Sequence, residues 1–145
     1  MMIRIIGSAM IVSGSYCMGR VLVSKRKKRL AALRTIFELF KDYEVQLKEY
    51  RCSLDEALKD KGMPADSIIG GEPIEGLERE DMERLIKAVD RLRRSPYRES
   101  VSVCDDLLQY LSLNIKREEE EYATVGKALP LVAGAMGVLV AVLLF

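Results

Sequence analysis

The chain has 145 residues, of which 49% are hydrophobic and 31% are charged, and its formal net charge is +1. These averages suit a soluble domain or a small membrane protein, and this length excludes a large enzyme with a deeply buried site. The chain has no histidine, which excludes Ser-His and Cys-His nucleophile pairs and imidazole acid–base catalysis.

Charge is distributed unevenly along the chain. Residues 1–24 contain only Arg4 and Arg20 as charged residues, and residues 128–145 contain none. Residues 38–127 contain 15 basic and 22 acidic residues, a local balance of −7, whereas residues 20–34 contain seven basic residues and no acid. Because this basic cluster borders an apolar stretch and is not spread over a domain with aromatic residues, we do not expect nucleic-acid binding.

The three cysteines, at positions 17, 52 and 104, are far apart in the sequence. No CxxC or zinc-type spacing is present, so we expect no metal site, no disulfide and no other cofactor. Three reduced thiols are typical of a cytosolic domain.

Residues 3–23 are apolar and form a first candidate membrane helix of about 31 Å, at ~1.5 Å per residue, which is enough for a hydrocarbon core of ~30 Å. The alternative is a cleavable signal peptide, but the main basic run follows the apolar stretch, which favours retention on the cytosolic side. The basic residues predicted to flank the membrane are Arg20, Lys25, Arg26, Lys27, Lys28 and Arg29.

A long amphipathic helix is predicted to continue this span. Its apolar stripe is predicted to consist of Leu30, Leu33, Phe37, Phe40, Leu47 and Tyr50, with Ile36 and Tyr43 at its flanks. Ser53 begins a capping box with Glu56, and Gly62 is predicted to end that short helix. Residues 62–76 form a loop with a turn of helix at 66–69, and they lack the glycine spacing of a phosphate-binding loop.

Two further helices are predicted at 77–94 and from about 97 onward, separated by Pro96, and the second is expected to run without interruption into the last apolar stretch. Nothing in the sequence is typical of a strand. An acidic run near the start of the last apolar stretch is interpreted as a solvated helix face or as a surface that contacts a partner protein. It consists of Glu118, Glu119, Glu120 and Glu121.

Residues 128–145 form the second candidate membrane helix. Ser15 with Gly19, and Ala133 with Gly137, are pairs of small residues four positions apart, which favour close packing of the two membrane helices. We therefore predict an all-α protein with membrane helices at 1–24 and 128–145 and a helical domain at 25–127, which the basic run places in the cytosol. With so little sequence outside the two spans, we expect the protein to act from the cytosolic face.

The order of these parts resembles the stage III sporulation protein AB family, membrane proteins of endospore-forming bacteria. The resemblance rests on IRIIGSAMIV with the basic run after it, on LAALRTIFELFKDYEVQLKEYRCSLDEAL with Leu54, Ala57 and Leu58, and on the ending GKALPLVAGAMGVLVAVLLF. These segments cover somewhat over half of the chain. The chain is shorter than family members and lacks their tryptophan-bearing helix. RRSPYRESVSVCDDLLQYL replaces it, so the family's surface is not transferred to residues 77–127.

The resemblance implies a cytosolic helical domain similar to the F-type domain of the inner-membrane platform proteins of type II secretion. It also implies a non-enzymatic component of a channel-like complex between mother cell and forespore, with other sporulation membrane proteins and a secretion-type ATPase as partners. Self-association into a homo-oligomer is a further possibility left open.

Two alternatives remain at this stage. One is a small regulatory membrane adaptor unrelated to sporulation. The other is a membrane-embedded hydrolase that uses Ser24 and Lys27 as a Ser-x-x-Lys dyad, which would require an enclosed pocket beside the basic run.

Overall fold

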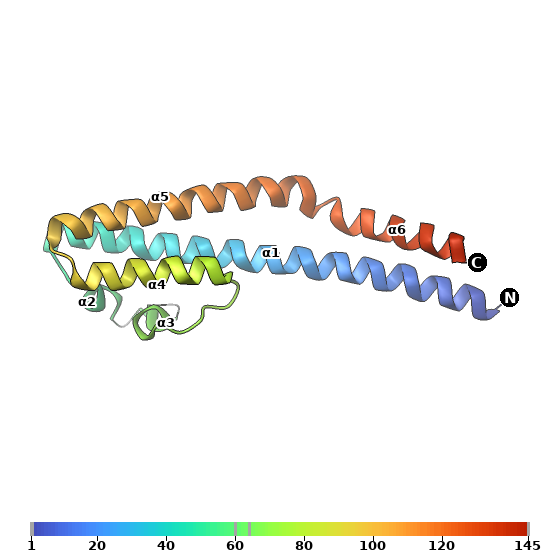
Figure 1. The fold of residues 1–145 in the computed structure, drawn as a ribbon, viewed down its shortest axis with the longest axis horizontal. Helices are drawn as coiled ribbons and strands as arrows, with labels where there is room; N and C mark the ends of the chain where they lie inside the picture. The colour runs from blue at the N-terminus through green and yellow to red at the C-terminus, as the bar shows by residue number, and fades with distance from the viewer. Residues whose placement is uncertain (1, 60, 64, 145) are drawn as a thin grey trace. The chain divides into compact units, whose positions relative to one another are not determined.

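The computed structural model describes residues 2–59, 61–63 and 65–144, and this part of the chain is helical without a strand (Figure 1). The prediction of an all-α protein is confirmed. The elements are α1 (Met2–Tyr50), α2 (Leu54–Leu58), α3 (Ala65–Gly70), α4 (Arg79–Arg94), α5 (Tyr97–Glu121), the π-helix η1 (Tyr122–Gly126) and α6 (Leu129–Leu144).

The chain divides into two compact units, which we describe separately. The terminal unit consists of Met1–Lys27 and Glu118–Phe145, and the central unit is Lys28–Arg117. Helix α1 contributes residues to both units. The predicted boundary at 24/25 is close to the first division. The predicted boundary at 127/128 is ten residues beyond the second, because the last turn of α5, η1 and Lys127 belong to the terminal unit.

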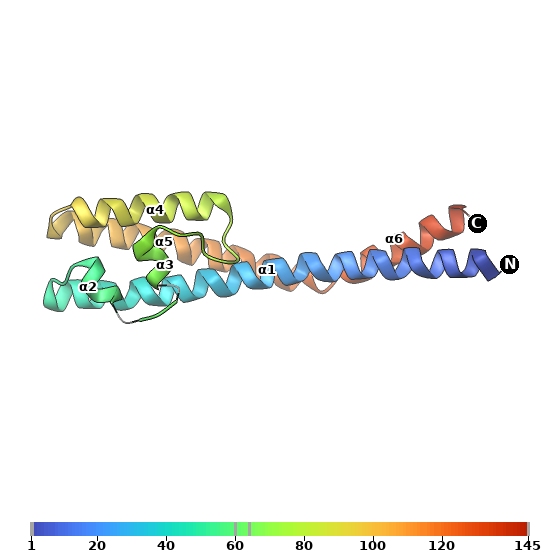
Figure 2. The ribbon, with the colours of Figure 1, turned by 90° about the horizontal axis from the view of Figure 1, so that it is seen from below.

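In the terminal unit, the first half of α1 lies beside α6, and the start of α1 is at the same end as the end of α6 in both views (Figures 1 and 2). The two segments are thus antiparallel. Two helical stretches are long and apolar enough to cross a membrane, and only 6% and 11% of their most apolar windows are buried within the protein. Apolar helices this exposed differ from the core helix of a soluble protein, which buries its apolar side chains.

The core of the central unit is built on one face of α1. Leu33, Ile36, Phe40, Tyr43 and Leu47 are all buried, and their alternating spacing of three and four residues aligns them along one side of a helix. They pack against buried residues of the four shorter elements. These are Leu54, Ala57, Leu58, Ala65, Ile68, Leu85, Val89, Leu92, Val103, Cys104, Leu107 and Leu111.

The line of residues predicted to be the centre of the apolar stripe on α1 was partly wrong. Ile36 and Tyr43, which were assigned to the flanks, are almost fully buried, whereas Phe37 is partly buried and Tyr50 is exposed. Tyr50 is the last residue of α1. Apolar character alone does not distinguish these residues, because the deciding factor is which face the neighbouring helices cover.

Local signals set the ends of the short helices. The Ser53 hydroxyl accepts a hydrogen bond from the amide of Glu56 at 3.4 Å, as predicted for a cap of α2. Gly62 does not end α2, which stops at Leu58. It lies before α3, where its carbonyl accepts from the amide of Asp66 at 3.0 Å.

The last predicted helix is interrupted, contrary to the sequence prediction of a continuous one. Residues Tyr122–Gly126 form a π-helix and residues 127–128 form a turn before α6 begins at Leu129. Pro130 has no amide hydrogen to donate to the carbonyl four residues earlier, at Gly126, and its ring crowds that carbonyl. The α-helical hydrogen-bond ladder therefore cannot pass through this position unchanged.

Candidate functional site

The contact between the two membrane-length helices is made through small residues. A Cβ atom on Gly19 would lie 3.0 Å from the Cα of Pro130 and 3.2 Å from the Cβ of Ala133. Contacts this short leave space for glycine alone unless the helices move apart. Gly19 thus lets the backbones of α1 and α6 approach closely.

The second contact lies further along the same pair of helices. A Cβ atom on Gly137 would lie 2.9 Å from the Ser15 Oγ and 3.2 Å from the Cα of Val12. The structure therefore brings together all four residues named from the sequence as helix-pairing, Ser15 with Gly137 and Gly19 with Ala133. By contrast, Gly14 on α1 has nothing within 4 Å of its Cβ position, so it lies outside the contact.

The six basic residues at and after the end of the first apolar stretch are divided between the terminal unit and the central unit. Arg20, Lys25 and Lys27 are exposed. Arg26 forms an ion pair with Glu121 at 2.6 Å, and this pair joins α1 to the end of α5 within the terminal unit. That all six residues flank the membrane stays a prediction, and the structure shows that one of them, Arg26, also pairs with an acid.

Lys28 and Arg29 belong to the central unit and contact acids there. Lys28 lies 3.2 Å from Glu75. The Arg29 side chain is only 17% exposed, and it forms ion pairs with Glu78 at 3.3 Å and Asp81 at 3.0 Å. Its position in a partly buried network leaves it unsuited to lipid headgroups.

The acidic run does not form one exposed patch. Glu118 is buried and Glu121 is partly buried in its pair with Arg26, whereas Glu119 and Glu120 are exposed. Glu118 and Glu121 share a face because they are three residues apart on a helix, and that face points inward. Glu119 and Glu120 are the two exposed members of the run.

Sequence reasoning missed a polar network in the central unit that centres on Asp81. The carboxylate accepts hydrogen bonds from Arg29 of α1, through Nε at 3.0 Å and Nη2 at 3.3 Å, and from the hydroxyl of Tyr110 of α5 at 3.1 Å. It also accepts from the backbone amide of Glu78 at 3.4 Å, as the return bond of a capping box at the start of α4. Asp81 thus links α1, α4 and α5.

Two buried groups have strongly raised pKa values. Burial raises the pKa of the Cys104 thiol from 9.0 to about 12, and the negative charges of Glu44 and Asp105 add to the shift. Burial likewise raises the pKa of Tyr43 from 10.0 to about 12. Both groups remain protonated at neutral pH and are core side chains. All three cysteines are free thiols, and Cys17 is exposed on α1.

The residues considered for catalysis are not assembled into a site. Ser24 and Lys27 are both exposed on α1, and no hydrogen bond joins them in the part of the chain that the structure describes. Among the described residues, no group of three or more Cys, Asp or Glu side chains is placed to hold a metal ion.

No family model, curated protein or solved structure matches the chain.

Proposed function

We propose that this protein is a membrane-anchored docking platform, a diverged relative of the stage III sporulation protein AB family, in a transport complex between mother cell and forespore. In this proposal the central unit and the charged residues 118–121 of the terminal unit are in the mother-cell cytosol, where the protein binds a secretion-type ATPase and other sporulation membrane proteins. Its helical domain would then correspond to the F-type domain of type II secretion platforms. The protein acts by binding and not by catalysis.

One observation carries the proposal. The terminal unit joins two exposed apolar helices through glycine and small-residue contacts, while the central unit has its own core beneath a highly charged surface. Packing of membrane helices through small residues is typical of helices that associate in lipid, where apolar burial gives no advantage. The positive-inside rule adds the orientation, because Arg20, Lys25 and Lys27 are exposed next to the first apolar stretch.

The partner surface that we propose is smaller than the acidic run. Glu119 and Glu120 are the exposed members, and reversing all four glutamates would also break the Arg26–Glu121 pair. The double substitution Glu119→Lys and Glu120→Lys changes the surface without disturbing that pair.

The test is affinity purification of the tagged full chain from the membranes of sporulating cells. We expect the secretion-type ATPase to copurify with the wild type and to be lost from the Glu119→Lys, Glu120→Lys protein. The matched control reverses Glu38 and Glu49, two exposed glutamates of α1, and should retain the ATPase. A wild-type protein in the soluble fraction would refute the membrane anchor. Copurification of other membrane proteins without the ATPase would instead support the alternative of a regulatory adaptor.

A further inference from the structure

A cleft in the central unit is lined by residues of α4 and α5. These two helices are drawn next to each other in Figure 2. Its volume is about 230 Å³, which is below the roughly 300–1,000 Å³ of typical small-molecule pockets. It is lined by Arg84, Lys87, Ala88, Arg91, Val103, Asp106, Leu107 and Tyr110. A cleft of this size suits one side chain of a larger partner.

The floor of the cleft is apolar. Ala88 of α4 and Val103 and Leu107 of α5 all line it. Val103 and Leu107 belong to the buried core, so other core residues pack against them. An apolar side chain placed here would bury apolar surface against these residues.

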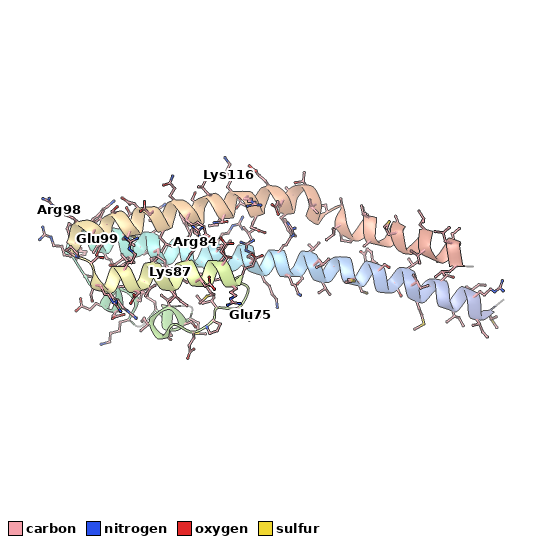
Figure 3. All side chains as sticks on the ribbon, in the orientation of Figure 1. Glu75, Arg84, Lys87, Arg98, Glu99 and Lys116 are labelled. Atoms are coloured by element: carbon pink, nitrogen blue, oxygen red, sulfur yellow. The ribbon has the colours of Figure 1, made fainter. Side chains whose placement is uncertain are left out.

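The rim on the α4 side is positively charged. Arg84, Lys87 and Arg91 are spaced by three and four residues, so they lie on one face of the helix; Figure 3 labels the first two on α4. The guanidinium of Arg84 lies over the ring of Tyr110, 4.6 Å from its centre. Asp106 is the one acid that lines the cleft.

These rim cations are weakly paired compared with the other arginines of α4. The Arg84–Glu80 distance is 3.6 Å and the Arg91–Glu99 distance is 3.9 Å, and no ion pair joins Lys87 to another described residue. Outside the cleft the pairs on α4 are closer. They are Arg79–Glu83 at 3.2 Å, Arg93–Asp55 at 3.0 Å and Arg94–Asp90 at 3.3 Å.

We propose that the α4–α5 cleft binds an acidic helical segment of a partner protein, with one apolar side chain over Ala88 and carboxylates on both sides of it that pair with Lys87, Arg84 and Arg91. Apolar anchors flanked by charge are the usual arrangement when a helix binds in a groove. The inference deepens the proposed docking function and rests on it, because it specifies the chemistry of a partner segment.

A protein segment fits this site better than a nucleic acid. Asp106 lines the cleft, and Glu80 and Glu99 lie beside its rim, so a continuous phosphodiester chain would meet repulsive charges. Arg84 already covers a face of Tyr110, the one aromatic residue among the described residues that line the cleft, so this face is not available for base stacking. Separated carboxylates can pair with the cations while avoiding these acids.

The test is a selection from a displayed library of random peptides of about twelve residues, long enough for three helical turns, against the full chain in detergent micelles. Peptides that bind the wild-type protein should be enriched in Asp and Glu on both sides of a Leu or Phe. Selected peptides are then measured by fluorescence anisotropy at ~0.15 M salt, where charges more than ~8 Å apart are largely screened. Single-stranded DNA of similar length serves as a second probe.

Three variants locate the binding. Lys87→Glu with Arg91→Glu should weaken the selected peptides about tenfold or more, and Ala88→Leu should do so at unchanged charge by filling the hollow. The control Arg79→Glu with Arg94→Glu makes the same charge change on α4 outside the cleft and should stay within about twofold. Circular dichroism verifies that each variant is folded.

Several outcomes would overturn the proposal. These are the absence of acidic enrichment, equal weakening by the control pair, unchanged binding to the Ala88→Leu protein, or tighter binding of the DNA through Lys87 and Arg91. None of these outcomes bears on whether the protein is anchored in the membrane or copurifies with an ATPase, so failure of the cleft and failure of the proposed function are distinguishable.

Discussion

Replacement of Asp81 tests how the three long helices of the central unit are held together. Its side chain is only 3% exposed, and it accepts hydrogen bonds from Arg29 on α1 and Tyr110 on α5 while capping α4. Asp81→Ala removes all of these acceptors at once. The Arg29 guanidinium, 17% exposed, would keep its 3.3 Å pair with the more exposed Glu78.

Loss of one member of a buried ion pair costs about 3–5 kcal/mol, because the remaining charge is left without compensation. We expect Asp81→Ala to lower the free energy of unfolding near the bottom of that range, since Arg29 retains Glu78. Asp81→Asn keeps the shape but loses the charge, and should cost about 2 kcal/mol, the value of a hydrogen bond to a charged group. Tyr110→Phe removes one hydrogen bond and should cost about 1 kcal/mol.

The assay is urea unfolding of the full chain in detergent micelles, followed by far-ultraviolet circular dichroism. The expected order of destabilisation is Asp81→Ala, then Asp81→Asn, then Tyr110→Phe. The double substitution Arg29→Met with Asp81→Leu should recover much of the loss, because it leaves no buried charge unpaired. If Asp81→Asn is no more destabilising than Tyr110→Phe, the charge of Asp81 does not hold the helices together and the reasoning is wrong.

Three further predictions follow from close contacts and burial. Gly137→Leu should destabilise the paired apolar helices α1 and α6 by about 1–3 kcal/mol through overpacking, whereas Gly14→Leu should change stability by less than about 0.5 kcal/mol. Thermal unfolding in detergent compares the two variants. Gly76 has φ +93°, and its Cβ position lies 2.8 Å from the Lys28 carbonyl oxygen, whereas Gly71 has φ +68° and nothing within 4 Å of its Cβ position. Gly76→Ala should therefore lower the free energy of unfolding by more than the roughly 1–2 kcal/mol expected for Gly71→Ala. Equal losses for the two variants would contradict the clash with Lys28. The pKa of Cys104 is raised from 9.0 to about 12 in the folded protein, so the thiol of the unfolded chain loses its proton first as the pH rises. The free energy of unfolding should therefore fall between about pH 9 and pH 12. A Cys104→Ala protein should show a smaller fall over the same range.

The helical class and the main elements could be predicted from the sequence because they depend on local patterns. Apolar spacing, the Ser53 cap and Pro96 act over a few residues, and α2, α4 and the start of α5 agree with them. The small residues at 15, 19, 133 and 137, which the sequence indicates as helix-pairing, lie together in the structure, since a close helix contact favours small side chains.

The polar contacts could not be predicted, because they depend on which helices pack together. Asp81 is 52 residues from Arg29 in the sequence and 29 from Tyr110, and nothing near it marks it as buried. The four glutamates at 118–121 cannot be told apart from the sequence alone, yet only Glu118 and Glu121 face inward. The π-helix before α6 is also a rare element without a recognised local signal, although Pro130 indicates a break nearby.

The most direct test of the account is the side of the membrane on which the central unit lies. With the native cysteines replaced by alanine, a cysteine introduced as Lys116→Cys on the exposed surface of α5 is probed in whole cells with a membrane-impermeant maleimide. A second protein carries Met2→Cys at the start of α1. The account predicts that Lys116→Cys reacts only after the membrane is permeabilised and that Met2→Cys reacts in intact cells. Labelling of Lys116→Cys in intact cells, or recovery of the protein in the soluble fraction, would contradict it.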